Sequence, residues 1–587
     1  MKKYIDNVLW ILVLFSMLTG LFTSCNEDLG NYDYTEINTV AIGEEYDANG
    51  ELKEGINDRT CDAGSTLKIE PILIFSSGED ESLFAYTWYY WKSDKWQVLQ
   101  EGRDLEIEIA DPIGTPDRSY SLAYELVNKK TQIPYRKLFS VRVTNVLSRG
   151  FIALCEQENG FDIDQIALSG SGELKLYKNV LEMSGSELPR QGVKPYDIVA
   201  FQDPMAPDPY NRVGLPYSLY ILTDQYTTRV LTTDYSWKPS YDISNSVESN
   251  SYLDKEYKQK GKPIVCQQMK YTYSVVSDKF NVKTLIYVKE ADGRGNWYVC
   301  NRWPAWYFYS VPMNDVRPGG GSRYEPSPSA FCGFNSAMYF DIDKKAFMYQ
   351  SFPRSAANMN TTDLYYTEAL PQEASGAAFN FSDPNEGLLY MGEQQDAIYP
   401  SAAYAILKQA DDSFKYIEFG DGSSLNNVVV TSNKKRVSII PANSNIGNAK
   451  FFARAPYSNV PYLYYVTNDN KVYKVDISAA NAIVSDITST ILTNDGYSEI
   501  TTFKYLLPNT NGSGADRTLA VATYNPSLGK DTGGKLEFFL IEDQASGQLV
   551  RAKFPSGEVE EGAYQIDMSW KGLGKVVGLS YKEYKEV

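Results

Sequence analysis

The chain has 587 residues, of which 43% are hydrophobic and 14% aromatic, and it carries a formal net charge of −18 with no histidine. This length exceeds the size at which single cores stop growing, which predicts two or more domains, and the apolar content excludes general disorder. The acidic charge argues against nucleic acid as a partner, because phosphate backbones are repelled. The lack of histidine excludes Ser-His-Asp triads, HExxH zinc sites and imidazole proton shuttles.

The first 30 residues have the pattern of an exported lipoprotein. A charged start, MKK, precedes an apolar run that is short for a membrane-spanning helix, so residues 1–24 are predicted to be a signal peptide. The segment LFTSC resembles a lipobox, which makes Cys25 the expected lipidation site and residues 25–30 a tether. A signal anchor with an incidental cysteine is the alternative. The following Asn-Glu-Asp resembles a signal for export to the outer leaflet of the outer membrane, with membrane contact through the lipid anchor only.

Residues 31–145 contain short alternating runs separated by turn-rich segments, which predicts a small β-sandwich. The expected strands are residues 66–75, 84–91, 104–110, 119–128 and 136–145. Trp88 lies in mid-domain within the aromatic run YTWYYW and is predicted to fill the core, whereas Trp91 and Trp96 flank a turn and are expected to be partly exposed. Such a sandwich would act as a spacer.

Residues 146–587 repeat one unit, in which an apolar run, a polar turn and a second alternating run follow one another. Seven such hairpins are expected, at residues 150–163, 218–231, 284–299, 337–350, 387–399, 462–477 and 518–541. A hairpin alone cannot bury both faces, so the repetition predicts an all-β β-propeller of about seven blades, with six or eight as the error range. A final strand at residues 574–582 is expected to pair with an early strand and close the ring. Several unrelated β-sandwiches in series are the alternative.

Three stretches together resemble one family. The lipobox cysteine followed by NEDLGNYDYTEINTV, the run YTWYYW and the boundary SRGFIALCE are similar to PKD-like family lipoproteins encoded beside Sus-type outer-membrane uptake systems. The resemblance implies a PKD or immunoglobulin-like sandwich and a surface-exposed accessory of a SusC/SusD-type transporter that imports glycans or peptides. It carries over no catalytic residue, and no cofactor is expected.

Two aromatic clusters fall where loops are expected, and both are candidate ligand-binding sites, because sugar rings and peptide side chains stack on such rings. The first cluster consists of Trp297, Arg302, Trp303, Trp306, Tyr307 and Tyr309. The second consists of Tyr235, Trp237 and Tyr241. Pro304 is expected to place part of the first cluster outside a regular central strand. Core packing is the alternative interpretation of both clusters.

The remaining cysteines and carboxylates indicate no further site. Five cysteines follow Cys25 without a CxxC spacing, which predicts neither a disulfide framework nor a zinc site. Most are expected to be buried, and one bridge among Cys266, Cys300 and Cys332 stays open as an alternative. The acidic turns lack the ligand spacing of a calcium loop, so no metal is expected.

These features favour a non-catalytic cell-surface lipoprotein that binds an oligosaccharide or peptide nutrient and assists a SusC/SusD-type transporter. Two alternatives stay open. One is a carboxylate-dependent glycoside hydrolase or lyase on the propeller. The other is a purely structural scaffold of the transporter complex.

Overall fold

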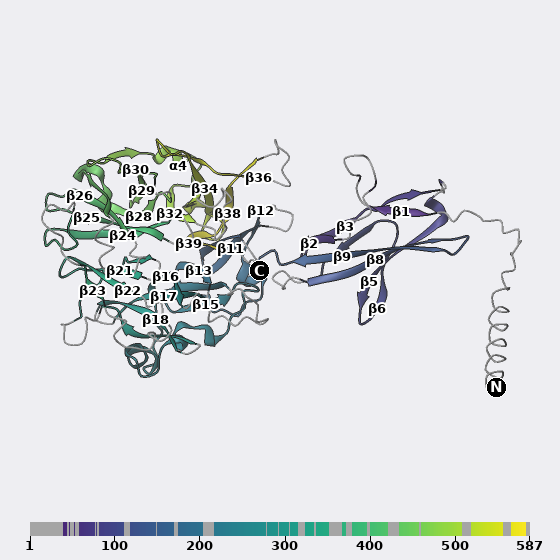
Figure 1. Ribbon diagram of the computed structural model, residues 1–587, viewed down its shortest axis with the longest axis horizontal. Coiled ribbons are helices and arrows are strands. Elements are labelled where there is room, and N and C mark those ends of the chain that lie inside the picture. The colour runs from purple at the N-terminus through teal and green to yellow at the C-terminus, as the bar shows by residue number, and fades with distance from the viewer. Residues whose placement is uncertain are drawn as a thin grey trace, which may run out of the picture. The chain divides into compact units, whose positions relative to one another are not determined.

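The computed structural model shows an all-β protein, as the sequence predicts (Figure 1). It describes residues 39–43, 46, 52, 58–76, 78, 81–110, 118–147, 150–168, 174–202, 217–276, 279–290, 293–303, 306–314, 323–333, 336–351, 367–370, 379–395, 400–420, 434–456, 459–506, 518–555 and 565–582. The short helices in these residues are η1 (Glu81–Leu83), α2 (Val180–Met183), η2 (Pro239–Tyr241), η3 (Ile243–Ser246), η4 (Asp254–Lys258), η7 (Ala442–Ser444), η8 (Ile446–Asn448), α4 (Thr488–Ile491) and η10 (Pro526–Leu528). None of these helices is long and apolar enough to cross a membrane.

Nine strands form the sandwich. They are β1 (Val40–Gly43), β2 (Asp58–Asp62), β3 (Thr66–Ile69), β4 (Ile72–Phe75), β5 (Phe84–Lys92), β6 (Lys95–Glu101), β7 (Leu105–Glu108), β8 (Arg118–Asn128) and β9 (Pro134–Thr144). Five of them form one sheet in the order β2-β9-β8-β5-β6, while β1 pairs with β4 and β3 pairs with β7. The expected single strand over residues 66–75 is wrong, because Pro71 separates β3 from β4 and cannot donate to a β-ladder.

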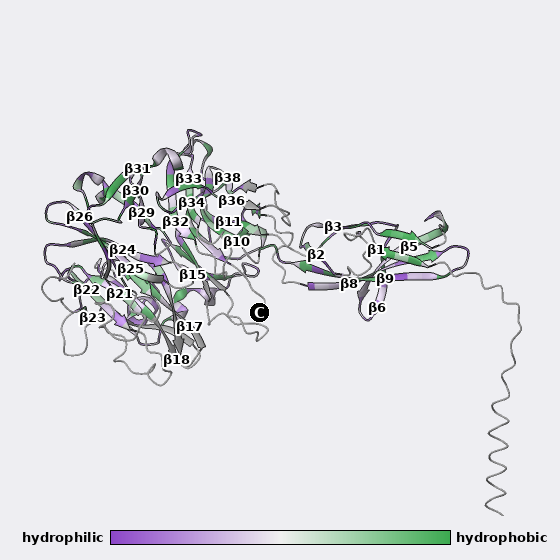
Figure 2. Ribbon diagram, turned by 45° about the horizontal axis from the view of Figure 1, so that its top comes forward, coloured by the Kyte–Doolittle hydropathy of each residue, from purple (hydrophilic) through white to green (hydrophobic). Residues whose placement is uncertain are grey.

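The sandwich core is built around Trp88, as predicted. Its side chain is fully buried, and its ring lies 4.5 Å from the ring of Tyr124 and 5.4 Å from that of Phe139. Neighbouring residues of a strand point to opposite faces, so Tyr89 and Trp91 lie on the other face of the sheet. Trp91 is 45% exposed, which confirms the expected partial exposure. Figure 2 shows hydrophobic residues, in green, on strands of this sandwich.

The body, which starts at β10, contains in its described residues seven sheets of three to five strands that follow one another along the chain, and a separate two-stranded sheet of β36 and β37. The strands are β10 (Gly150–Gln157), β11 (Gly160–Leu168) and β12 (Leu174–Tyr177); β13 (Pro195–Gln202), β14 (Tyr217–Thr223) and β15 (Thr227–Leu231); β16 (Cys266–Val276), β17 (Lys279–Lys289), β18 (Gly295–Trp303) and β19 (Trp306–Pro312); β20 (Phe331–Gly333), β21 (Ser336–Asp341), β22 (Ala346–Ser351) and β23 (Glu368–Ala369); β24 (Gly387–Gln395), β25 (Pro400–Lys408), β26 (Phe414–Gly420) and β27 (Lys434–Ile440); β28 (Ala449–Arg454), β29 (Tyr462–Thr467), β30 (Val472–Asp476) and β31 (Ile483–Asp486); β32 (Glu499–Leu506), β33 (Thr518–Tyr524), β34 (Gly534–Asp543) and β35 (Gln548–Arg551); and the last strands β36 (Lys553–Pro555), β37 (Gln565–Asp567), β38 (Ser569–Leu573) and β39 (Lys575–Lys582).

Each of the seven predicted hairpins falls in a different sheet of the body. Six of them are pairs of consecutive antiparallel strands, such as β10 with β11 and β33 with β34. The expected hairpin at residues 387–399 is wrong in extent, because β24 runs unbroken to Gln395 and its partner β25 begins at Pro400. Its polar residues therefore continue the strand and do not form the expected turn.

The last strand pairs with an early one, as predicted. Strand β39 is antiparallel to β10, with Lys582 opposite Gly150 and Ser580 opposite Ile152. Gly574 precedes β39, and a Cβ atom there would lie 2.6 Å from the Cβ of Cys155. Its backbone N–H donates to the buried carboxylate of Asp164 at 2.9 Å. The absence of a side chain at position 574 thus allows the C-terminal strand to enter the first sheet.

The first strands of six sheets and β39, the last strand of the chain, lie against one another. Strand β13 contacts β39 and β16, β16 contacts β20, β20 contacts β24, β28 contacts β32, and β32 contacts β39. Between β24 and β28 the rings of Tyr390 and Phe452 stack with centroids 4.6 Å apart. These seven strands therefore form a circular series of neighbours.

Candidate functional site

The first aromatic cluster lies on the hairpin formed by β18 and β19. The register places Trp303 opposite Trp306, Arg302 opposite Tyr307, and Cys300 opposite Tyr309. Strand β19 is the outermost strand of its sheet. The hairpin thus brings five of the six predicted residues together near its turn. Pro304 and the side chains of residues 300–303 and 306–311 lie outside the described part of the structure.

Trp297 lies at the other end of β18 and belongs to the core. Its side chain is fully buried, and its ring lies 5.3 Å from Tyr287 and 6.0 Å from Tyr339. The indole Nε1 donates to the carbonyl of Ser327 at 2.9 Å. Because a fully enclosed ring offers no face to a ligand, packing accounts for this residue.

The second cluster is spread over separate environments. Tyr235 is fully buried with a left-handed φ of 56°, and the ammonium of Lys582 lies 4.3 Å from its ring. Trp237 is half-buried and donates from Nε1 to Thr228 Oγ1 at 2.9 Å. The ring of Tyr241 is 8% exposed and is approached by the cation of Arg229. The three residues therefore do not present a joint stacking surface.

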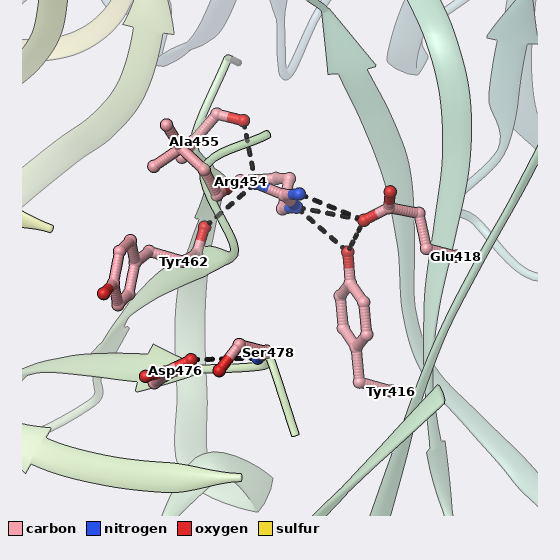
Figure 3. A network of polar contacts seen from close by, with 8 residues as sticks. Tyr416, Glu418, Arg454, Ala455, Tyr462, Asp476 and Ser478 are labelled. Atoms are coloured by element: carbon pink, nitrogen blue, oxygen red, sulfur yellow. Dashed lines mark hydrogen bonds and ion pairs between the residues drawn. The ribbon is translucent and has the colours of Figure 1, made fainter. Parts of the chain in front are cut away.

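A charged network that the sequence analysis missed joins two neighbouring sheets of the body (Figure 3). Arg454, at the end of β28, contacts Glu418 Oε2 of β26 through Nε at 3.2 Å and Nη2 at 3.1 Å. Tyr416 donates from its hydroxyl to the same carboxylate oxygen at 2.7 Å and accepts from Arg454 Nε at 3.1 Å. The remaining donors of Arg454 satisfy the carbonyls of Ala455, Val460 and Tyr462.

This network is closed to solvent. The side chains of Arg454 and Glu418 are 0% and 2% exposed. Burial and the adjacent carboxylate raise the pKa of Tyr416, so its hydroxyl stays protonated and donates. Burial opposes the charge of Arg454, but Tyr416 and Glu418 outweigh it and raise the pKa of the guanidinium. The arrangement links β26 to the loop after β28, and it is structural because no substrate atom can reach it.

Ion pairs also connect the first strands of different sheets. Lys270 of β16 lies 2.6 Å from Glu393 of β24, and the intervening Cys332 of β20 donates its backbone N–H to the same carboxylate at 3.3 Å. Lys575 of β39 lies 2.9 Å from Glu499 of β32. These pairs are partly exposed, so they connect strands of different sheets at a solvated surface.

Arg454 and Glu418 left a weak signal in the sequence. Each is a charged residue inside an otherwise apolar run, FKYIEFG for Glu418 and AKFFAR for Arg454. A charge in a strand usually marks the solvent-facing side, so the pattern alone could not show that both side chains point inward.

The described residues contain no cluster of three or more His, Cys, Asp or Glu side chains placed to hold a metal. Cys155, Cys266 and Cys332 are buried, as expected for most cysteines. Burial raises the pKa of Cys155, with the Asp164 carboxylate adding to the effect. Such thiols are poor nucleophiles, because the thiolate is the reactive form. The side chain of Cys300 lies outside the described residues.

Residues 25–191 match the model of the PKD-like family. No curated protein matches the chain. One similar solved structure is a quinonprotein alcohol dehydrogenase-like protein from Bacteroides thetaiotaomicron, which is 10% identical with a TM-score of 0.32. The match covers 90% of this chain and 97% of that chain. A second is a putative 6-phosphogluconolactonase from Bacteroides fragilis, which is 12% identical with a TM-score of 0.33; the match covers 74% of this chain and 98% of that chain. A third is AztD from Citrobacter koseri, which is 10% identical with a TM-score of 0.31; the match covers 86% of this chain and 100% of that chain. Similarity at this level transfers no activity.

Proposed function

We propose that the protein is a lipid-anchored, non-catalytic lipoprotein of the outer-membrane surface that binds an oligosaccharide or peptide nutrient for a SusC/SusD-type transporter. Support for the anchor comes from the family match, which begins at Cys25, the residue predicted to carry the lipid. In the proposed arrangement the sandwich separates the body from the membrane, and the body binds the nutrient. Cys25 itself lies outside the described residues.

The body is proposed to be a closed propeller of seven blades, one for each sheet. Two observations support this. Strand β39 completes the sheet of β10, so the last strand of the chain is shared with the first sheet. The first strands of the sheets also follow one another in a circular series of contacts. Closure of this kind leaves no exposed sheet at either end of the array.

The observation that carries the binding function is the register of the β18–β19 hairpin. It sets Trp303 directly opposite Trp306 and Arg302 directly opposite Tyr307 on the last two strands of one sheet, of which β19 is the edge. Directly opposed residues have closely spaced Cβ atoms. Two tryptophans at directly opposed positions of a hairpin are a suitable stacking surface for a sugar or peptide ring.

Binding of the soluble protein, starting after Cys25, to an array of glycans and peptide digests tests this function. We expect a hit in one of the two classes. Trp303→Ala combined with Trp306→Ala should weaken it by about tenfold or more, because stacking on two rings contributes on the order of 1–3 kcal/mol. Unchanged binding by the double variant would remove this hairpin as the site. Ile483→Ala is the control, since its side chain is 65% exposed on the body and belongs to neither aromatic cluster.

Two further results would replace the proposal. Turnover of any polysaccharide by the purified protein would establish the hydrolase or lyase alternative. Co-purification with a transporter, without affinity for any glycan or peptide, would establish a scaffold.

The lipid anchor is tested separately with Cys25→Ser. This variant should abolish lipid labelling and release the protein from the membrane fraction. Retention in the membrane fraction with unchanged labelling would refute the anchor.

A further inference from the structure

The β5–β6 hairpin of the sandwich carries a second pair of tryptophans on its outer face. Trp91 and Trp96 are direct cross-strand partners. Their ring centroids lie 5.2 Å apart and the ring planes meet at 69°, so the two indoles form an aromatic corner. Strand β6 is the edge of its sheet, and Trp91 is 45% exposed. These rings lie on the face of the sheet opposite Trp88, so they add nothing to the core.

A charged pair is fixed beside this aromatic corner. The guanidinium of Arg136, on β9, lies 5.6 Å from the Trp96 ring and 5.4 Å from the Tyr89 ring. Its Nε and Nη2 atoms contact Glu125 Oε2 at 3.1 and 3.0 Å. The hydroxyl of Tyr89 donates to Glu125 Oε1 at 3.1 Å. All four side chains come from strands of one sheet, so the group is held rigidly. The charges of Arg136 and Glu125 are opposite, so the group carries no net charge.

Several polar atoms of this group are left for a ligand. Among the described residues, the Nε1 atoms of Trp91 and Trp96 and the Nη1 atom of Arg136 make no hydrogen bond. Arg136 is 39% exposed and Glu125 is 18% exposed, so solvent reaches both. Glu125 Oε1 accepts one hydrogen bond, from Tyr89, and its second lone pair can accept another. The surface therefore offers an apolar ring face, free N–H donors and a carboxylate acceptor side by side.

We propose that Trp91, Trp96, Arg136 and Glu125 form a binding site for an uncharged sugar ring of an oligosaccharide. The C–H face of the sugar would stack on the exposed indole of Trp91, with Trp96 as the side wall of the site. Two neighbouring hydroxyl groups would then pair with the charged residues. One accepts from Arg136 Nη1, and the other donates to Glu125.

Charge and hydrogen-bond chemistry favour this occupant over two others. An acidic glycan would gain little, because Glu125 already neutralises Arg136. A proline-rich peptide could stack on the indoles, but it has no hydroxyl or backbone N–H at its prolines to donate to Glu125. Only a neutral polyol ring matches the apolar corner, the donors and the acceptor together. The site belongs to the sandwich, so it adds to the proposed function, which assigns the ligand to the body.

The test is affinity electrophoresis and calorimetry on the full chain from Asn26 with xyloglucan and galactomannan as neutral probes. Polygalacturonate serves as the acidic probe and an oligoproline as the peptide probe. We expect retention by at least one neutral glycan, with about tenfold weaker binding for Trp91→Ala, because one stacked ring contributes on the order of 1 kcal/mol. Trp91→Phe should restore part of the affinity, and Glu125→Gln should weaken it while the melting temperature stays unchanged.

Matched variants separate this site from the body. Ile483→Ala removes a side chain of the body that is 65% exposed and should leave binding unchanged. Trp303→Ala with Trp306→Ala tests only the hairpin of the body, so unchanged binding by this double variant together with weaker binding by Trp91→Ala would refute the proposed site in the body and leave the site in the sandwich. The inference is overturned if no neutral glycan binds, if Trp91→Ala binds as well as the native chain, or if only the acidic or peptide probe is retained.

Discussion

The sandwich and the body contain the same chemical group, an arginine, a glutamate and a tyrosine, in opposite environments. In the body, Arg454 binds Glu418 through Nε and Nη2, and Tyr416 donates to the same carboxylate. In the sandwich, Arg136 binds Glu125 through the same two atoms, and Tyr89 donates to that carboxylate. The arginine side chain is 0% exposed in the body and 39% exposed in the sandwich.

This difference shows that burial, and not the choice of residues, decides the role of such a group. Nη1 of Arg454 donates to backbone carbonyls, so each of the three guanidinium nitrogens has a partner inside the protein. The third nitrogen of Arg136 has no partner among the described residues. The body uses the group to join sheets, whereas the sandwich keeps it available at the surface.

Replacement of the two arginines by methionine should give the largest contrast. Arg454→Met leaves Glu418 buried without a counter-charge, which costs about 3–5 kcal/mol of unfolding free energy. Arg136→Met removes an exposed pair, which costs about 0–1 kcal/mol. Urea unfolding of both full-length variants measures the two effects. Equal losses would show that burial does not separate the two groups.

The double variant Arg454→Met with Glu418→Gln is the control for the larger effect. It removes the uncompensated charge and should recover part of the lost stability. A double variant as unstable as Arg454→Met alone would attribute the loss to packing or to the three carbonyls.

The pH dependence of stability offers a second comparison, of intermediate size. In the body, Asp495 lies 3.0 Å from the buried Lys535 ammonium and 3.1 Å from Lys571. Burial alone would raise the pKa of Asp495, but the hydrogen bonds from Lys535 and Lys571 prevail and lower it to about 2. The carboxylate therefore stabilises the fold at pH values above its ordinary pKa of about 4. This contribution is lost as the pH falls towards about 2.

Asp495→Asn should remove this pH-dependent part. The native chain should lose about 1–2 kcal/mol more stability than the variant between about pH 5 and pH 2, measured by urea unfolding. In the sandwich, Lys68 and Glu70 form a pair whose side chains are 58% and 60% exposed. Glu70→Gln should leave the pH profile unchanged, because solvent screens this pair. Parallel profiles for Asp495→Asn and the native chain would contradict the prediction.

The smallest effect concerns two turns with left-handed residues. Asp94 lies between β5 and β6 with φ of 61°, and Lys345 lies between β21 and β22 with φ of 54°. Aspartate tolerates this conformation better than lysine, because its short polar side chain can bond locally. Lys345→Gly should therefore stabilise the body by about 0.5 kcal/mol, and Asp94→Gly should be close to neutral in the sandwich. Thermal melting measures both, and a larger gain for Asp94→Gly would reverse the interpretation.

Two kinds of strand were found from sequence: alternating strands of the sandwich, such as β5, and strands of the body with both faces buried. Strands β21, β29 and β33 are buried at every residue and were identified as apolar runs. The first strands of the sheets, such as β16 and β28, contain lysine or arginine and were missed. Their polar residues face other first strands, and this environment exists only once the sheets are assembled.

The aromatic residues show the same limit. Alternation along β5 was enough to separate the buried Trp88 from the exposed Trp91. In residues 296–310 alternation did not separate core residues from candidate binding residues. Trp297 and Trp303 lie at opposite ends of the same strand, and only the register and the burial of Trp297 distinguish them.

The sequence by itself determined the all-β class, the core role of Trp88, the position of six of the seven predicted hairpins and the pairing of the last strand with an early one. These features depend on local alternation, on turns and on the number of strands, which short stretches of sequence record. Only the tertiary structure decided which charges meet and which face water. Glu418 and Arg454 are 36 residues apart, and Glu125 and Arg136 are 11 apart. Their contacts arise because sheet assembly fixes both the partner and the access of solvent, and no local pattern contains either.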